Sequence, residues 1–183
     1  IAQEHSAVRD CAGLFDIAHM GVLEVSGPFA GRFLDLVSSN SIINLAPNKA
    51  MYSYLLDGDG EVVDDIMIYR LEKDNFITVV NAANNDRVIA WLNYLNEGRL
   101  LPGPDGPVAL EGKARIRDLK HASSGSDQKV DIAIQGPRST EILARILRSK
   151  ADQARLHQLL HNDFIQLEVA GAPAYISRTG YTG

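Results

Sequence analysis

Cysteine is almost missing from this chain of 183 residues, in which Cys11 is the only one. A single cysteine excludes the internal disulfides that stabilise many small secreted domains and fits a reducing compartment. No apolar run approaches the roughly 20 residues of a membrane-spanning helix. No dense tract of Lys or Arg is present, and the net charge is −5. We therefore expect a protein that binds neither a membrane nor nucleic acid.

Metal-binding and phosphate-binding motifs are also missing. His157 and His161 are four residues apart on an expected helix, but no HExxH motif surrounds them and no third ligand is evident. The glycines at positions 58 and 60 join two expected strands and open no helix, so they predict a tight turn and not a phosphate loop. We therefore expect no metal site.

The residues that are present predict a globular α+β fold. An apolar fraction of 45% and a charged fraction of 22% are ordinary for a chain with a real core. Three strands joined by short turns are expected over residues 51–57, 61–71 and 76–81, which indicates an antiparallel meander. Further strands are expected over 22–25, 114–120, 130–134, 164–169 and 173–177. Helices are expected over 4–11, 84–95, 138–147 and 151–161 and from residue 28, the last capped by Ser26 or Gly27.

The middle strand of the meander carries one anomaly, the adjacent residues Asp64 and Asp65. Side chains alternate between the faces of a strand, so the two carboxylates should point in opposite directions. The alternation predicts Val63, Met67 and Tyr69 on the face of Asp65, and Val62, Ile66, Ile68 and Arg70 on the face of Asp64. Two interpretations remain open from the strand alone. One aspartate is solvated and the other is paired with a residue such as Arg70, or a carboxylate lines a pocket.

Four segments of the chain follow one another in a distinctive order: AVRDCAGLFDIAHMG (7–21), DGEVVDDIMIYRL (59–71), VVNAAN (79–84), and AIQGP (133–137) with SRTGYTG (177–183). In order and spacing they resemble the folate-binding aminomethyltransferase family, whose type member is the T-protein of the glycine cleavage system. The resemblance implies a two-lobed folate-binding domain with mainly antiparallel sheets and flanking helices. Residues 1–21 with 129–183 would form the first lobe, and residues 22–128 an inserted α/β second lobe. The chain would then be a fragment without the family's N-terminal start and C-terminal barrel.

The same resemblance implies an enzyme, an aminomethyltransferase of glycine catabolism, and names its site. Asp65 stands at the family's catalytic position. The positions that line the folate site are Met20, Met67, Tyr69, Asn81 and Tyr181, with Arg178 as a supporting residue. The reaction would move a one-carbon unit from an aminomethyl group on a lipoylated carrier, the H-protein, to tetrahydrofolate and release ammonia. The expected location is the cytoplasm, or the mitochondrial matrix in a eukaryote.

Two other functions stay open. The chain could be the folate-binding part of a flavin-linked demethylating dehydrogenase or oxidase, which an upstream dinucleotide-binding motif would favour. It could also be a non-catalytic folate-binding relative, against which the presence of Asp65 argues. If Asp65 lines the pocket, Asp65→Asn should cost on the order of 10²–10⁴ in turnover. Asp64→Asn, on the opposite face, should act mainly on stability, by about 0.5–3 kcal/mol.

Overall fold

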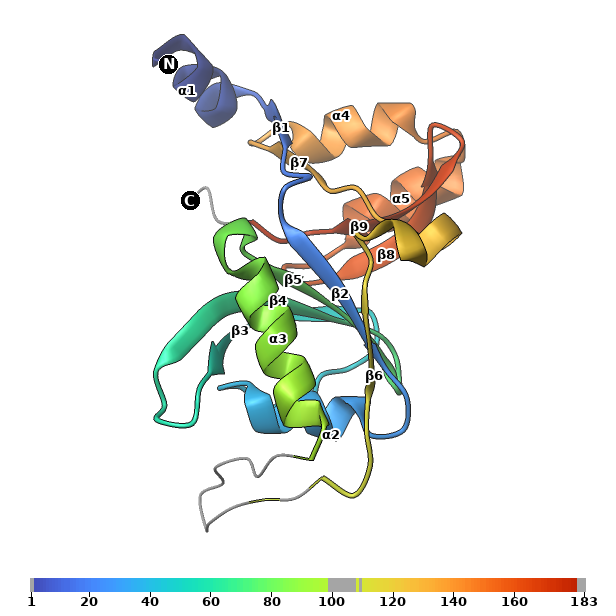
Figure 1. The fold of residues 1–183 in the computed structure, drawn as a ribbon. Helices are drawn as coiled ribbons and strands as arrows, with labels where there is room; N and C mark the ends of the chain where they lie inside the picture. The colour runs from blue at the N-terminus through green and yellow to red at the C-terminus, as the bar shows by residue number, and fades with distance from the viewer. Residues whose placement is uncertain (1, 99–107, 109, 181–183) are drawn as a thin grey trace. The chain divides into compact units, whose positions relative to one another are not determined.

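The computed structural model describes residues 2–98, 108 and 110–180. The chain divides into two compact units, His19–Val130 and the combination of Ile1–Ala18 with Asp131–Gly183. Figure 1 labels the helices and strands of both units. They form a mixed α+β fold in which every strand pair is antiparallel, so the predicted fold class is confirmed. The lobe boundaries that the resemblance implies stay a prediction.

A five-stranded antiparallel sheet forms the centre of the unit His19–Val130. Its strands are β2 (Gly21–Ser26), β3 (Lys49–Leu56), β4 (Val62–Glu72), β5 (Asn75–Val80) and β6 (Arg115–Asp118). They lie in the order β3-β4-β5-β2-β6. The predicted meander is therefore confirmed as β3-β4-β5, because short turns between apolar runs leave antiparallel pairing as the only local solution. The predicted edge strand is β6, which pairs with β2.

Two helices, α2 (Ala30–Val37) and α3 (Asn85–Asn96), cover one face of this sheet. Alternate residues of the strands point into that core, and so do residues three and four apart on the helices. The buried cluster includes Leu23, Val25, Phe33, Leu34, Ile66, Ile68, Phe76, Val88, Leu92 and Leu95. Trp91 lies at the rim of this core, where its Nε1 donates to the backbone oxygen of Leu56 (3.1 Å).

Neither Ser26 nor Gly27 occupies the N-cap position that was expected for it at the second helix. The helix α2 begins at Ala30, and the N-cap position is taken by Phe29, which makes no side-chain capping bond. The backbone oxygen of Gly27 accepts the N–H of Ala30 at 2.9 Å instead. Gly27 has φ +102°, a conformation that glycine adopts at little cost and that sets this turn after β2.

A β-bulge changes which residues share a face at the start of β4. Asp64 pairs with Leu55 and Val62 with Leu56, so the register shifts between the two partners and Val63 is the extra residue. Val63 is buried in the helix-side core, whereas Val62 is 54% exposed. A bulge places two residues of one strand against one of its partner and breaks the alternation. The predicted grouping of Val63 with Asp65, and of Val62 with Asp64, is therefore wrong on this side of the bulge.

The opposite face of the sheet carries a smaller apolar cluster. Its buried members are Val22, Ile77 and Leu119, and Tyr69, Leu71 and Val79 pack against them. Cross-strand pairs extend this face outward, since Tyr52 lies opposite Met67 and Met67 lies opposite Val79. Tyr52 and Tyr54 are 44% and 42% exposed. This face therefore combines an apolar floor with exposed aromatic rings.

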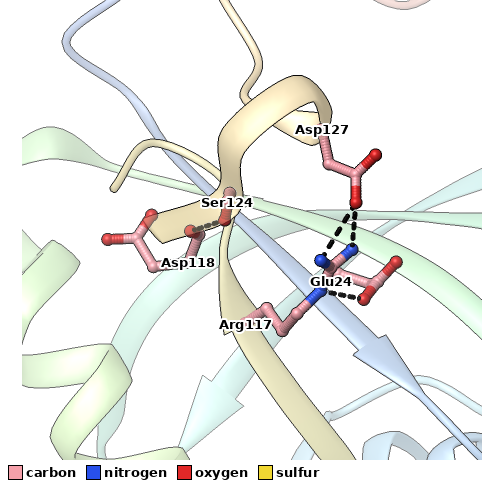
Figure 2. A network of polar contacts seen from close by, with 5 residues as sticks. All are labelled: Glu24, Arg117, Asp118, Ser124 and Asp127. Carbon is pink, nitrogen blue, oxygen red and sulfur yellow. Dashed lines mark hydrogen bonds and ion pairs between the residues drawn. The ribbon is translucent and has the colours of Figure 1, made fainter. Parts of the chain in front are cut away.

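A polar network holds β6 to the sheet, as Figure 2 shows. Arg117 lies opposite Glu24 in the strand register, and its Nε is 2.6 Å from Glu24 Oε2. The same guanidinium is 3.0 Å from Asp127 Oδ2. Asp127 ends the 3-10 segment η2 (Ala122–Asp127), and Ser124 Oγ in that segment donates to the backbone oxygen of Asp118 (2.7 Å). Residues 122–127 are thus partly helical and are fixed to the sheet by Arg117 and by the hydrogen bond of Ser124.

The other unit has a separate small core. Its strands pair as β1 (Gly13–Asp16) with β7 (Ile132–Gln135) and as β8 (Phe164–Val169) with β9 (Ala172–Ser177). Its helices are α1 (Ala2–Asp10), α4 (Ser139–Ile146) and α5 (Lys150–Gln158). The core residues are Ala144, Leu147, Leu156, Leu159 and Leu167. Because α5 ends at Gln158, His161 lies outside the helix, and the expected i, i+4 spacing of His157 and His161 on one helix is wrong.

Candidate functional site

The two adjacent aspartates of β4 have opposite environments. Asp64 is only 3% exposed and points to the same side of the strand as the buried Ile66 and Ile68, whereas Asp65 is exposed. Asp65 lies directly across from Tyr54 in the register with β3. The expectation that the two carboxylates leave the strand on opposite faces therefore matches the structure.

Asp64 is a buried carboxylate that neutral donors satisfy. Its Oδ2 accepts the backbone N–H of Asn81 at 2.9 Å, and its Oδ1 accepts the side-chain Nδ2 of Asn81 at 3.0 Å. Oδ1 also accepts Nδ2 of Asn84 at 2.6 Å. Burying a carboxylate is costly unless its lone pairs find donors, and here three donors converge on it. The expected alternative partner Arg70 is wrong, because its guanidinium binds backbone oxygens, among them those of Ile43 and Leu45.

Asn81 connects the buried aspartate to the exposed one. Its Nδ2 is 2.8 Å from Asp65 Oδ1 and 3.1 Å from the backbone oxygen of Asp65, in addition to its bond with Asp64. Asn81 follows β5, and the last cross-strand pair before it is Met67 with Val79. Continuing that register by two residues places Asn81 opposite Asp65. The amide group therefore lies between two carboxylates and donates to both.

A turn after β5 brings these asparagines into place. The 3-10 segment η1 (Ala82–Asn84) follows Asn81, and the N–H of Asn84 donates to the backbone oxygen of Asn81 at 3.0 Å. Gly21 in β2 permits the close approach of this turn. A Cβ atom at Gly21 would lie 2.0 Å from Oδ1 of Asn85 and 2.6 Å from Cγ2 of Val80. Only glycine fits there without a shift of the turn.

Aromatic side chains surround the exposed carboxylate. The hydroxyl of Tyr52 donates to Asp65 Oδ2 at 3.1 Å. The rings of Tyr52 and Tyr54 are 5.5 Å apart at an interplanar angle of 79°, the edge-to-face geometry that aromatic pairs prefer. A hydrogen bond with Tyr54 is the largest cause of a raised pKa at Tyr52, followed by desolvation and the hydrogen bond to Asp65.

No cation neutralises either aspartate within the described part of the chain. Asp64 contacts Asn81 and Asn84, and Asp65 contacts Asn81 and Tyr52. All these donors are neutral, so none of them offsets the negative charge of an ionised carboxylate. Chemically, such a site can accept N–H donors, take up a proton, or stabilise a positive charge that develops nearby.

The structure brings together some of the predicted site residues and not others. Asp65, Met67, Tyr69 and Asn81 belong to the same face or edge of the five-stranded sheet. Met20 is half-buried and precedes Gly21, which pairs with Val80, so Met20 and Asn81 extend beyond the same end of the β2–β5 pair.

The remaining predicted residues belong to the other unit. The guanidinium of Arg178 donates to the backbone oxygen of Leu159 at 2.7 Å. The backbone N–H of Arg178 donates to the backbone oxygen of Asp163 at 2.8 Å. It therefore holds the segment between α5 and β8 of its own unit. Tyr181 lies outside the described residues.

Sequence reasoning missed two residues of this site, Tyr52 and Asn84. Tyr52 could have been found, because it follows the same alternation along β3 that places Tyr54 across from Asp65. Asn84 depends on the 3-10 turn of η1, for which the sequence carries no periodic signal. Among residues 2–98, 108 and 110–180, no group of three or more His, Cys, Asp or Glu side chains is arranged to hold a metal ion. No helix in this part of the chain is both long and apolar enough to cross a membrane.

Curated relatives match this chain along its entire length. An aminomethyltransferase of Chloroherpeton thalassium is 36% identical over 183 residues, and one of Chlorobaculum tepidum is 38% identical over 183 residues. In both cases the match covers 100% of this chain and 44% of the relative. The chain thus spans less than half the length of these relatives.

Two solved structures resemble the fold. The glycine cleavage system aminomethyltransferase T from Bartonella henselae superposes with a TM-score of 0.75 at 28% identity, over 98% of this chain and 42% of that chain. The heterotetrameric sarcosine oxidase from Corynebacterium sp. U-96 gives a TM-score of 0.52 at 14% identity, over 98% of this chain and 77% of that chain. At that identity the second likeness is one of fold alone.

The family model described as the GCVT N-terminal domain matches residues 1–183. That match includes β4 with its paired aspartates and the Asn81–Asn84 turn. The chain therefore belongs to the GCVT N-terminal domain family.

Proposed function

We propose that this chain is the folate-binding part of a tetrahydrofolate-dependent aminomethyltransferase of glycine cleavage. The complete enzyme moves a one-carbon unit from an aminomethyl group on a lipoylated carrier protein to tetrahydrofolate and releases ammonia. Membership of the family and relatives named aminomethyltransferase support this function. Because the chain spans 44% of those relatives, the activity belongs to the longer protein.

The observation that carries the proposal is the exposed, unneutralised carboxylate of Asp65 beside an aromatic and apolar wall. A structural aspartate on a sheet is usually solvated or paired with a cation. Asp65 instead receives two neutral hydrogen bonds, one on each oxygen, from Asn81 and Tyr52. Each carboxylate oxygen keeps a further lone pair, so Asp65 is held in one orientation and can still accept a ligand N–H.

The wall around Asp65 fits a flat ring that carries N–H donors. Met67 and Tyr69 follow Asp65 on the same face of β4, and Tyr52 lies opposite Met67. A thioether and aromatic rings contact a planar heterocycle well, while carboxylate and amide oxygens fix its orientation. Tetrahydrofolate, when bound, supplies the ring nitrogen that takes up the one-carbon unit. Asn81, Met67, Tyr69 and Met20 would hold the ring. The roles that the resemblance gives to Tyr181 and Arg178 stay predictions.

Asp65 can serve this reaction in one of three ways. It can orient the attacking N–H by accepting its hydrogen bond, take up the proton that the nitrogen loses, or stabilise the positive charge that develops on the methylene carbon and its nitrogen. A carboxylate with no cation near it serves the last task best, because a salt bridge would cancel its field. The Tyr52 hydroxyl and the Asn81 amide hold the carboxylate still for these steps.

Two other functions make different predictions. The folate-binding part of a flavin-linked demethylating enzyme shares the fold that the sarcosine oxidase likeness supports, but it would require a flavin and an N-methylated amine. A non-catalytic relative would bind folate without turnover. Neither alternative is favoured by an observation at Asp65.

The deciding experiment uses the full-length protein. Calorimetry measures tetrahydrofolate binding, and a single-turnover assay with the aminomethyl-loaded lipoyl carrier measures ammonia release and one-carbon transfer. We expect both binding and transfer without added flavin. Binding without transfer would favour the non-catalytic relative. Turnover of an N-methylated amine that depends on flavin would favour the demethylating enzyme, and the absence of folate binding would refute all three.

A further inference from the structure

Asp64 lies on the opposite side of the strand from the proposed reacting group, yet it is joined to that group through one side chain. It accepts both the backbone N–H and the side-chain Nδ2 of Asn81. The same Nδ2 donates to Asp65 Oδ1 at 2.8 Å. The two aspartates are therefore connected through Asn81, although they lie on opposite faces of the strand.

The two ends of an amide group differ chemically, so the side chain of Asn81 fits between the two carboxylates in one orientation. A side-chain amide has two N–H donors on one end and an acceptor oxygen on the other. Asn81 offers Nδ2 to Asp64 Oδ1 and to Asp65 Oδ1, 3.0 and 2.8 Å away. In the flipped orientation its oxygen would face two carboxylate oxygens, and that contact is repulsive. The two aspartates together therefore determine which end of Asn81 faces Asp65.

The fixed orientation leaves the amide oxygen of Asn81 available. That oxygen makes no hydrogen bond with any residue in the described ranges, and Asn81 is only partly buried. It lies on the same side chain whose Nδ2 contacts Asp65, so an acceptor oxygen and a carboxylate are offered together to a ligand. A ligand with two neighbouring N–H donors suits this pair.

Asp64 is itself held rigidly. It is 3% exposed, and Asn84 Nδ2 donates to its Oδ1 at 2.6 Å in addition to the two bonds from Asn81. Asn84 occupies the N-cap position of α3, and its side chain makes no capping bond to that helix. The side chain of Asn84 thus binds Asp64 and does not cap the helix, although asparagine is a favoured capping residue.

From this geometry we propose that Asp64 is a positioning residue. Its buried carboxylate, supported by Asn84, fixes the rotamer and amide orientation of Asn81, and through Asn81 it fixes the Asp65 carboxylate. The inference rests on the proposed function for its effect on turnover, but the orientation of Asn81 is a property of the free protein. It differs from the expectation drawn from the strand pattern, in which Asp64 acts mainly on stability.

The test compares Asp64→Asn with Asp57→Asn in the full-length protein. Asp64→Asn keeps the shape of the side chain but lets the amide of Asn81 reorient. The matched control Asp57 lies in the β3–β4 turn, where its Oδ1 accepts the N–H groups of Asp59 (3.0 Å) and Glu61 (2.9 Å). Both variants lose a carboxylate that neutral N–H groups satisfy, and both should lower the melting temperature.

Only Asp64→Asn should change the site. We expect its kcat to fall by about 10²-fold, the cost of misplacing a reacting group by roughly 1 Å, with a smaller rise in KM for tetrahydrofolate. The side-chain amide signals of Asn81, read by NMR in protein labelled at asparagine nitrogen, should shift. Asp57→Asn should leave kcat, KM and those signals unchanged. Asn84→Ala, which removes one donor to Asp64, should give a smaller change in the same direction.

The outcomes separate this inference from the proposed function. Unmoved Asn81 signals in both Asp64→Asn and Asn84→Ala would overturn the positioning role, whatever the activity. If Asp64→Asn does not fold, Asn84→Ala decides alone. A wild-type protein that transfers no one-carbon unit would refute the proposed function, and the Asn81 signals would then decide the positioning role by themselves.

Discussion

Two acidic clusters lie at the same five-stranded sheet, and their carboxylates bind different kinds of partner. At the edge strand β6, Glu24 and Asp127 both contact the guanidinium of Arg117. On β4, the hydrogen-bond partners of Asp64 and Asp65 among the described residues are amides and a phenol. One cluster therefore has a cation at its centre, and the other has a neutral amide at its centre.

The difference predicts what each cluster can do. In the Arg117 cluster one guanidinium offsets part of the charge of two carboxylates, and its hydrogen bonds to Glu24 and Asp127 raise the pKa of Arg117. In the Asp64–Asp65 cluster two like charges are kept close together, which costs energy unless hydrogen bonds and solvent offset it. Two adjacent carboxylates therefore make the protein no more stable than an ion pair would. The exposed carboxylate of Asp65 is therefore open to a ligand, whereas Glu24 and Asp127 are already bound to a guanidinium.

The largest effect is expected from Asp65→Asn, compared with Glu24→Gln. Both substitutions replace a carboxylate on this sheet by an amide of similar shape. Asp65→Asn should lower single-turnover transfer by on the order of 10²–10⁴, the usual contribution of a positioned acid–base group, while folate affinity changes less. Glu24→Gln should leave transfer unchanged and reduce stability. Equal losses of activity in the two variants would mean that the clusters do not differ in function.

The next effect concerns the wall beside Asp65. Tyr69→Ala removes an aromatic ring from the open face, and we expect the affinity for tetrahydrofolate to fall roughly tenfold, as the loss of about 1.4 kcal/mol of ring contact would cause. Tyr94→Ala is the control. Tyr94 is 50% exposed and stacks on Trp91 on the helix side, with ring centroids 5.7 Å apart. Calorimetry on both variants should separate them, and unchanged affinity in a folded Tyr69→Ala would remove Tyr69 from the site.

Much of this fold follows from local patterns in the sequence. The meander β3-β4-β5 was predictable because short turns separate runs rich in β-branched residues. The helix α3 was predictable because Val88, Leu92 and Leu95 recur on one face. The bulge at Val63 was not predictable, because it depends on how β4 meets Leu55 and Leu56 of its partner strand. One extra residue there moved Val63 into the core without changing the strand's composition.

The candidate site was predictable only in part. The face of Asp65 was correct from Met67 onward, since the alternation is undisturbed after the bulge. The partners of Asp64 were not predictable from the strand, because they come from the turn after β5. A carboxylate buried without a cation also contradicts the simplest electrostatic expectation, which selected Arg70. The register places Asn81 opposite Asp65, so pairing the strands first would have found the connection between the two.

A smaller effect should follow from breaking the ion-paired cluster. In Arg117→Met the carboxylate of Glu24, whose side chain is 16% exposed, loses its partner. We expect a lower melting temperature, with a difference from wild type that shrinks as salt screens the pair. Arg145→Met is the control, since the pair of Arg145 with Glu141 has side chains that are 70% and 46% exposed and such pairs contribute little. Equal shifts in the two variants would show that the Arg117 cluster is no more than a surface pair.

The smallest effect is a proton titration at Tyr52. Its hydrogen bonds to Tyr54 and Asp65 and its desolvation favour the neutral phenol, so the pKa in the folded protein is raised above the ordinary value near 10. Folding therefore gains a contribution from this phenol that is fully present below about pH 10 and is lost as the pH rises through the folded-state pKa. Ultraviolet absorbance of tyrosinate should show a late ionisation step, and Tyr52→Phe should remove that step.

Removing either neighbour of Tyr52 should lower its pKa. The hydrogen bond with Tyr54 is the largest single cause of the raised pKa, and Asp65 contributes through a hydrogen bond and through its charge. Tyr54→Phe and Asp65→Asn should therefore each move the late step to lower pH. Near-ultraviolet circular dichroism, recorded at each pH, separates ionisation in the folded protein from alkaline unfolding. A larger shift in Asp65→Asn than in Tyr54→Phe would mean that the carboxylate controls this phenol, and Tyr52 would then respond to whatever ligand neutralises Asp65.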